Sequence, residues 1–221
     1  MNKNNVPLSI KLVEMQFSQG YQYHIYNQGN NRQKIFFHPA NFLFFREKIK
    51  THIMPFADIL AYCLMPNHFH LMVEIKEVEL LRSAISGLNL PHNSAGNLRN
   101  SKNMISINES IGVLLRSYTR AINIQEKRTG ALFREGTKAI CLNETKLSKN
   151  WFISQGVTYL NTEIPVKQYS QVCFNYIHFN PVVAKLVAKV EDWEYSSYYD
   201  LLHNKTDIVS KDSIESNGLK V

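Results

Sequence analysis

The sequence predicts an α+β protein of the ferredoxin-like class, with an antiparallel sheet, helices packed on one face, and insertions. The main observation is the order of its hydrophobic patterns, which reads strand, helix, hairpin, helix, strand. The 221 residues are 44% hydrophobic, which is enough to bury the core of one sizeable domain. No run of 18 or more apolar residues interrupts these patterns, so no membrane span is expected.

The first half of the chain supplies most of these elements. Residues 21–26 alternate and are rich in aromatic side chains, which indicates a strand. After a turn at residues 27–31, a helix is expected over about 38–52, with apolar residues on one stripe. Residues 57–65 and 69–75 form a predicted hairpin, and a second helix is expected to start at Ser106, whose hydroxyl suits an N-cap. A last short strand is expected at 138–142.

The other segments are less regular. Residues 76–105 are rich in Asn, Ser and Gly and predict a long loop or insertion, while 145–165 give no clear pattern. A helix is expected from about 168 to 179, because a proline disfavours helical backbone at the residue before it. Asn180 would then be the N-cap of a following helix that begins at Pro181. Residues 1–19 are expected to be a flexible arm, 20–203 the folded domain, and 204–221 a frayed polar tail.

Charge and cysteine content restrict the partners and the compartment. The net charge is +7 and the pI about 9.2, which fits a polyanionic partner without requiring one. The three cysteines, Cys63, Cys141 and Cys173, form no C-x-x-C pair, so a zinc ribbon or disulfide scaffold is not expected. A reducing cytoplasm is consistent with them, and the N-terminus lacks the apolar core of a signal peptide.

The most informative motif is His68-Phe69-His70, at the start of the second strand of the hairpin. Residues i and i+2 of a strand point to one face, so both imidazoles are expected on one side of the sheet and Phe69 on the other. Two convergent imidazoles are half of a site for a divalent cation. The alternative is a pair of ordinary surface or hydrogen-bonded histidines, which the spacing alone does not exclude.

The string around these histidines, YCLMPNHFHLMVE at 62–74, resembles the hallmark segment of the HUH single-tyrosine transposases. That family includes small insertion-sequence transposases and REP-associated tyrosine transposases. Three further strings are similar to family segments: YNQGNNRQKIF at 26–36, RTGALF at 128–133 and DWEYSS at 192–197. The resemblance covers most of 20–203 and implies a ferredoxin-like catalytic domain there. Two departures are the REGTKA string after Phe133 and the lengthened segments 76–105 and 145–165.

Two tyrosines compete for the role of nucleophile. Tyr118 lies on the predicted second helix, whereas Tyr176 begins YIHFNPV, which resembles the family segment whose first tyrosine attacks DNA. The resemblance therefore favours Tyr176. It also implies that Asn180, one helical turn later, completes a metal site with His68 and His70. The alternatives are core packing for Tyr176 and helix capping for Asn180.

The resemblance implies cleavage and rejoining of single-stranded DNA, with recognition of DNA hairpins. Tyr176 would form a 5′-phosphotyrosine with the help of Mg²⁺ or Mn²⁺ and without a nucleotide, in agreement with the lack of a P-loop. A homodimer that exchanges tyrosine helices is left open, and no membrane partner is expected. The candidates for phosphate contacts are the basic residues Arg32, Lys34, Arg116, Arg120, Lys127, Arg128, Arg134 and Lys138, although a solvated charged face is the alternative.

Two other functions remain open. One is a catalytically silent, domesticated protein that only binds DNA hairpins. The other is a metal-dependent phosphodiesterase without a covalent intermediate, which requires a carboxylate or base near the metal. Glu74 lies on the same predicted strand face as His70 and is the candidate for that base.

Overall fold

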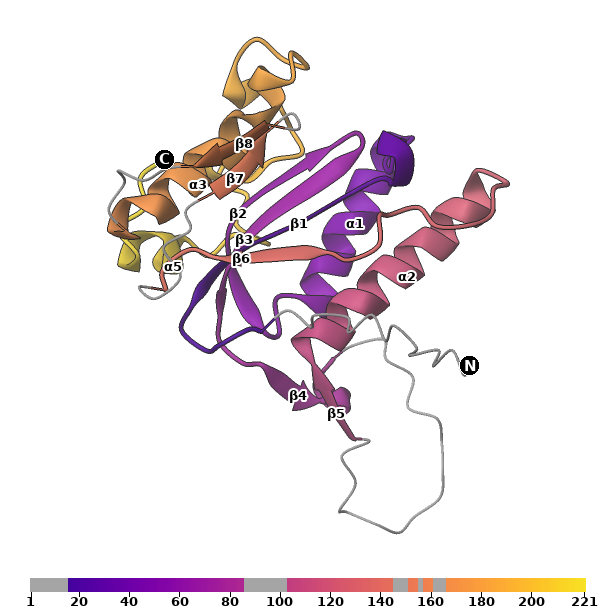
Figure 1. Cartoon of the computed structure of the whole chain (residues 1–221), viewed down its shortest axis with the longest axis horizontal. Coiled ribbons are helices and arrows are strands. Elements are labelled where there is room, and N and C mark those ends of the chain that lie inside the picture. The colour runs from indigo at the N-terminus through magenta and orange to yellow at the C-terminus, as the bar shows by residue number, and fades with distance from the viewer. Residues whose placement is uncertain (1–15, 86–102, 145–150, 155–156, 161–165) are drawn as a thin grey trace, which may run out of the picture.

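The computed structural model describes residues 16–85, 103–144, 151–154, 157–160 and 166–221. Its centre is a four-stranded antiparallel sheet with strand order β2-β3-β1-β6 (Figure 1). The strands are β1 (Gln22–Gln28), β2 (Ala57–Met65), β3 (His68–Ile75) and β6 (Lys138–Cys141). Helix α1 (Pro39–His52) joins β1 to β2, and α2 (Ile107–Gln125) precedes β6. The predicted fold class is confirmed, and these four strands and helix α1 begin and end within a few residues of the expected positions.

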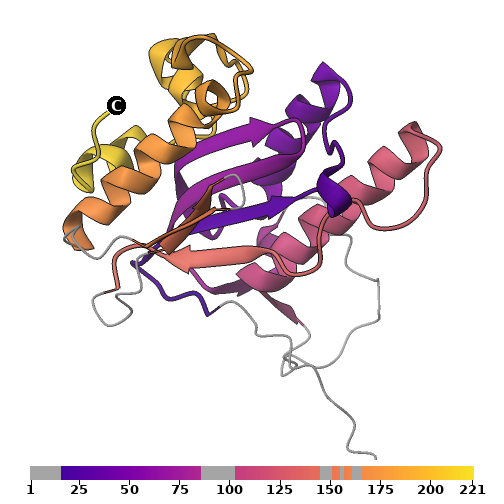
Figure 2. The same ribbon diagram turned by 45° about the horizontal axis from the view of Figure 1, so that its top comes forward.

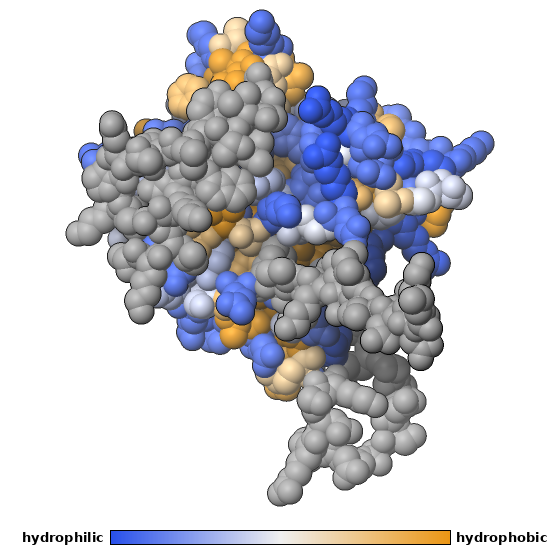
Figure 3. All heavy atoms as spheres, viewed as in Figure 1, coloured by the Kyte–Doolittle hydropathy of each residue, from blue (hydrophilic) through white to orange (hydrophobic). Residues whose placement is uncertain are grey.

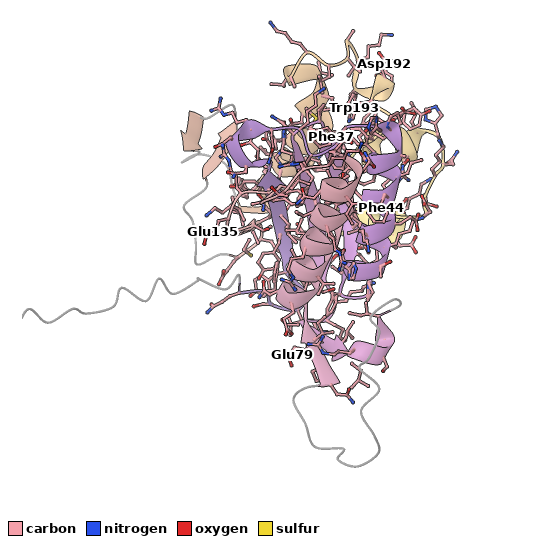
Figure 4. All side chains as sticks on the ribbon, turned by 90° about the vertical axis from the view of Figure 1, so that its right-hand side faces the viewer. Phe37, Phe44, Glu79, Glu135, Asp192 and Trp193 are labelled. Carbon is pink, nitrogen blue, oxygen red and sulfur yellow. The ribbon has the colours of Figure 1, made fainter. Side chains whose placement is uncertain are left out.

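Helices α1 and α2 pack side by side on one face of the sheet (Figure 4). Phe69 of β3 points to this face, where its ring lies 5.1 Å from that of Phe45 on α1 and 6.0 Å from that of Phe133. Tyr118 of α2 packs against Phe45, with ring centroids 4.9 Å apart. These aromatic rings form the main core, and their burial orients β3 so that its histidines point the other way.

Helix α3 (Val166–Val183) crosses the opposite face of the sheet (Figure 2). Its stripe of Tyr169, Cys173, Tyr176 and Asn180 follows the spacing of one helix face, and Tyr169 and Cys173 are buried. Near its start, the Ser170 hydroxyl donates a hydrogen bond of 2.5 Å to Oε1 of Gln22 on β1. Tyr176 and Asn180 are thereby held over the sheet, next to β3.

The expected helix end at Asn180 is wrong. Asn180 and Pro181 both lie inside α3, so Asn180 is not the N-cap of a new helix. A proline removes one backbone donor and normally weakens a helix interior. Here it stands two residues before the helix ends at Val183, and the turn continues through a hydrogen bond from Ala184 N to Asn180 O of 2.9 Å. The packing of α3 on the sheet therefore outweighs the local preference.

The expectation of a frayed tail after residue 204 is also wrong. Val209 forms a parallel bridge with Ile59 of β2, and Ser210 N donates a hydrogen bond of 3.0 Å to Ile59 O. Helix α5 (Lys211–Ser216) follows, and the segment buries the apolar side chains of Ile208, Val209, Ile214 and Leu219. Burial of these few residues fixes a segment that is polar on average.

The remaining segments are short. The expected loop 76–105 contains β4 (Glu79–Leu81) and η2 (Arg82–Ala84), and β5 (Met104–Ser106) pairs with β4; residues 86–102 lie outside the described part. Within 145–165, β7 (Trp151–Ser154) pairs with β8 (Val157–Leu160). The other short elements are η1 (Asn30–Arg32), η4 (Val190–Asp192) and α4 (Ser197–Leu202).

Of the expected arm at 1–19, residues 1–15 lie outside the described part. Phe17 packs edge-on against Tyr23 of β1, with ring centroids 4.8 Å apart. The described end of the arm is therefore held against the sheet. Among the described residues, no helix is long and apolar enough to span a bilayer.

Candidate active site

The two histidines of the HFH motif lie together on the face of the sheet that α3 covers. Their ring centroids are 4.9 Å apart; His68 is half-buried and His70 is buried. The alternation of β3 produces this arrangement, because Phe69 between them is anchored in the core on the other face. The predicted geometry of the pair is confirmed.

Each imidazole is oriented by a hydrogen bond at its Nδ1 atom. His68 Nδ1 lies 2.6 Å from Oδ1 of Asn67, and His70 Nδ1 lies 2.9 Å from Nε2 of His24. Burial lowers the pKa of both imidazoles below the ordinary 6.5, so both are neutral at pH 7. A neutral imidazole whose Nδ1 carries the proton has its lone pair on Nε2. Both Nε2 atoms face Asn180.

The side-chain amide of Asn180 completes the cluster. Its Oδ1 atom lies 3.3 Å from His68 Nε2, and its Nδ2 atom lies 3.3 Å from His70 Nε2. With the Nδ1 proton of His68 donated to Asn67, the lone pair of His68 Nε2 faces the lone pairs of the amide oxygen. A cation between these atoms would satisfy both groups.

The three side chains fit a divalent metal ion. The 3.3 Å between His68 Nε2 and Asn180 Oδ1 matches neighbouring ligands around one ion whose bonds are about 2.1 Å long, which places them about 3 Å apart. His70 Nε2 faces the same amide group through its nitrogen, Nδ2. The part of the chain that the structure describes contains no cluster of three or more His, Cys, Asp or Glu side chains that could hold a metal. A site here therefore depends on the amide of Asn180. Mixed imidazole and amide ligands suit Mn²⁺ or Mg²⁺.

Tyr176 lies one helical turn before Asn180 and faces the same histidines. Its ring stands edge-on to His70 at 5.4 Å and to His24 at 6.0 Å. Burial raises the pKa of Tyr176 to about 12, although a hydrogen bond with Asn180 opposes the shift. The phenol is therefore protonated at neutral pH, and a phenol in that state reacts as a nucleophile only after activation.

Tyr118, the second candidate nucleophile, lies elsewhere. It is fully buried in the core on the opposite face of the sheet, and its hydroxyl donates a hydrogen bond of 2.8 Å to Ile35 O. The structure brings Tyr176, and not Tyr118, to the histidine pair.

A cavity of about 750 Å³ opens above the histidines and contains half of the predicted basic residues. It is lined by the four candidate site residues His68, His70, Tyr176 and Asn180, and also by Arg32, Lys34, Arg134 and Lys138. Arg32 and Lys34 come from the segment after β1, while Arg134 and Lys138 flank the start of β6. The sequence spreads these side chains over more than 100 residues, and the sheet brings them to one opening.

A second cavity, of about 1070 Å³, adjoins the first at residues 134–136. The other four predicted basic residues line it: Arg116, Arg120, Lys127 and Arg128. The face over the end of α2 and the loop that follows is mostly hydrophilic (Figure 3). No ion pair joins any of the eight basic side chains to a carboxylate of the described residues. Their charges are available to an anionic ligand.

The family-like strings converge at this end of the sheet. Gly29 N donates to Asn67 O and Asn30 N donates to Leu132 O, each at 2.8 Å, so three of the strings meet there. Position 29 requires glycine because the backbone of Gln33 passes close to it. A Cβ atom at this position would lie 2.1 Å from Gln33 O. The turn that carries Arg32 and Lys34 is thereby closed against the hairpin.

The fourth string fastens α3 to the sheet. Trp193 Nε1 donates to Leu64 O at 3.1 Å, and the hydroxyl of Ser197 bonds to the backbone of Tyr62. His178 of α3 lies 2.7 Å, Nε2 to Oγ, from the same hydroxyl. His178 is thus a packing residue, and its contact positions the helix that carries Tyr176.

Glu74, the candidate base of the phosphodiesterase alternative, does not line the cavity. Its carboxylate accepts a hydrogen bond of 2.6 Å from Nδ2 of Asn217, and it is not among the cavity-lining residues. The acidic residue that lines both cavities is Glu135, whose side chain lies at the outer edge of the molecule (Figure 4).

Two residues of the site were missed from the sequence. His24 orients His70 from behind, and Tyr26 lines the cavity beside it. The available signal was the alternation of β1, which places His24, Tyr26 and Gln28 on one face. The alternation alone could not place His24 and Tyr26 at the site, because that also requires the pairing register of β1 with β3.

Comparison with known proteins gives a likeness in fold. No protein-family model matches this chain, and no curated protein matches it. A solved structure of a REP-associated tyrosine transposase bound to a REP hairpin is similar, with a TM-score of 0.51 and 16% sequence identity. The match covers 89% of this chain and 88% of that chain. At this identity the likeness establishes a shared fold over nearly the whole chain.

Proposed function

We propose that this chain is a metal-dependent single-tyrosine transposase that cleaves and rejoins single-stranded DNA carrying a hairpin. The observation that carries the proposal is the convergence of His68, His70, Asn180 and Tyr176 in one cavity with basic side chains that form no ion pair with a described carboxylate. The structural likeness to a transposase bound to a DNA hairpin supports the same substrate class.

Each residue has a defined part in the proposed reaction. His68, His70 and Asn180 would hold a divalent cation, which when bound supplies positive charge to the scissile phosphate. The oxygen of Tyr176 attacks phosphorus, an O–P bond to tyrosine forms, and the bond from phosphorus to the 3′-oxygen breaks. The phenol proton is lost and the 3′-oxygen gains one, so the products are a 5′-phosphotyrosine and a free 3′-hydroxyl.

The reverse reaction rejoins DNA. A 3′-hydroxyl attacks the phosphotyrosine and releases Tyr176, so the phosphodiester is exchanged and no nucleotide is consumed. The basic side chains of the two cavities would contact the backbone of the bound strand, because phosphates are the usual partners of Arg and Lys in such complexes.

The test uses the full chain, Mn²⁺ and single-stranded DNA from the hairpin-bearing regions that flank its gene, labelled at its 3′ end because the 5′-phosphotyrosine retains the strand on that side of the cut. We expect a labelled band of higher mass that persists in denaturing gels and disappears after protease treatment. Cleavage without such a band would favour the phosphodiesterase, and binding without cleavage would favour the silent hairpin-binding protein.

A further inference from the structure

A second tyrosine, Tyr26, stands in the floor of the cavity. Strand β1 pairs Tyr26 with His70 of β3 on one side and with Lys138 of β6 on the other. Directly opposed residues of antiparallel strands point to the same face, so the three side chains form one row. All three line the cavity that also contains Tyr176 and Asn180.

The Tyr26 hydroxyl has no protein partner among the residues that the structure describes. Its side chain is half-buried, with its ring 4.9 Å from that of His24 and 5.9 Å from that of His70. By contrast, the buried tyrosines Tyr23, Tyr62 and Tyr118 each donate a hydrogen bond to another residue. The Tyr26 ring lines the cavity, so its hydroxyl is available to a ligand there.

The chemistry of the row defines the ligand. At neutral pH a tyrosine hydroxyl is an uncharged donor, and a lysine ammonium offers donors only. Lys138 is exposed and forms no ion pair with a described carboxylate. Two adjacent donors beside a pair of metal-binding histidines favour an oxyanion, and the anion of the proposed reaction is the scissile phosphate.

We propose that Tyr26, with Lys138 beside it, donates a hydrogen bond to an unesterified oxygen of the scissile phosphate and stabilises its charge in the transition state. The inference rests on the proposed function. It gives the two tyrosines of the cavity different roles, since Tyr176 forms the covalent bond and Tyr26 remains protonated and touches the same phosphate from the sheet.

The first measurement is the single-turnover rate of adduct formation by the full chain with Mn²⁺. Tyr26→Phe keeps the ring, and we expect a rate about 10²-fold lower, as for loss of one donor to a developing oxyanion. Mn²⁺ affinity and DNA affinity should equal those of the wild type. Tyr21→Phe, at an exposed tyrosine outside the cavity, is the matched control and should react at the wild-type rate.

The second measurement uses DNA in which sulfur replaces one unesterified oxygen at the scissile phosphate, as two separated isomers. Sulfur is a poor acceptor, so the loss caused by Tyr26→Phe should shrink on one isomer and persist on the other. Lys138→Met should show the same preference if it contacts the same oxygen. The two isomers distinguish direct contact from a structural role. A purely structural change would lower the rate on both isomers by the same factor.

The outcomes are distinct. A wild-type rate for Tyr26→Phe, or equal losses on both isomers, overturns the inference and leaves the proposed function standing. An adduct mapped by mass spectrometry to Tyr26 also overturns it, because Tyr26 would then be a nucleophile. A wild-type chain that forms no adduct overturns both proposals.

Discussion

The Nε2 atom of His24 lies 2.9 Å from the Nδ1 atom of His70, so a third histidine stands behind one of the two that face the cavity. His24 is buried and is not among the residues that line the cavity. Its role follows from the hydrogen bond: if the Nδ1 proton of His70 is held by His24, the Nε2 lone pair of His70 is free to bind a metal.

His24→Phe should weaken Mn²⁺ binding without removing a ligand. The substitution keeps an aromatic ring on β1 but leaves His70 Nδ1 without its partner, and loss of such a partner costs about 10- to 100-fold in metal affinity. Calorimetry with Mn²⁺ measures the effect. His203→Phe, at an exposed histidine on the far segment, is the control and should bind as the wild type does. Wild-type Mn²⁺ affinity in His24→Phe would show that His24 does not orient His70 for metal binding.

His68→Ala and His70→Ala should each abolish both Mn²⁺ binding and DNA cleavage. Each removes one of the three proposed ligands, and two ligands hold an ion poorly in water. The fold should survive, because neither imidazole belongs to the aromatic core around Phe69. Circular dichroism checks the fold and calorimetry the binding. Retention of Mn²⁺ affinity in both variants would place the ion elsewhere.

Arg134→Ala should weaken binding of single-stranded DNA and flatten its dependence on salt. Arg134 lies where the two cavities adjoin and forms no ion pair with a described carboxylate. Each phosphate contact to a single strand contributes about 0.7 to the slope of log K against log salt, so the slope should fall by about that amount. Lys189→Ala, at an exposed lysine near Glu191 that lines neither cavity, should leave the slope unchanged. Equal slopes for all three proteins would contradict the assignment.

The free energy of unfolding should fall as pH drops below about 6.5. Burial lowers the pKa of His24 and of His178 to about 3, whereas an unfolded histidine titrates near 6.5. Below pH 6.5 the unfolded chain therefore gains protons that the folded chain does not accept until about pH 3. The stabilisation is present above pH 6.5 and is lost on acidification, by about 2 kcal/mol per histidine between pH 7 and pH 5.

Urea unfolding of the wild type and of His178→Asn at pH 7 and pH 5 checks this expectation. Asparagine can still bond to Ser197 but does not titrate, so the loss between the two pH values should shrink by about 2 kcal/mol. An unchanged loss would show that His178 does not carry the effect.

The sequence predicted the elements whose signals are local. The helices that became α1 and α2, and the hairpin of β2 and β3, follow from periodicity, and the paired orientation of His68 and His70 follows from the alternation of a strand. What was missed depends on tertiary contacts. Pro181 lies within a helix because α3 packs on the sheet, and the C-terminal segment is ordered by a few scattered apolar residues that form no periodic pattern.

The candidate site was predicted only in part for the same reason. Tyr176 and Asn180 were chosen by resemblance, since eleven tyrosines gave no other basis for a choice. His24 and Tyr26 belong to the site through strand pairing, since the register places His24 opposite Met72 and Tyr26 opposite His70, which are 48 and 44 residues away in the sequence. Period-2 alternation indicates which side chains share a face, but not which strand lies beside them.

The most direct test of the proposed function compares two tyrosine variants in one adduct experiment. Tyr176→Phe removes the oxygen that would bond to phosphorus and keeps the ring against His70. Tyr118→Phe removes a buried donor to Ile35 O, which costs about 1–3 kcal/mol of stability but leaves the cavity intact. With hairpin-bearing single-stranded DNA and Mn²⁺, Tyr118→Phe should form the protease-sensitive adduct and Tyr176→Phe should form none while still binding Mn²⁺ and DNA. An adduct of wild-type yield from Tyr176→Phe would contradict the account.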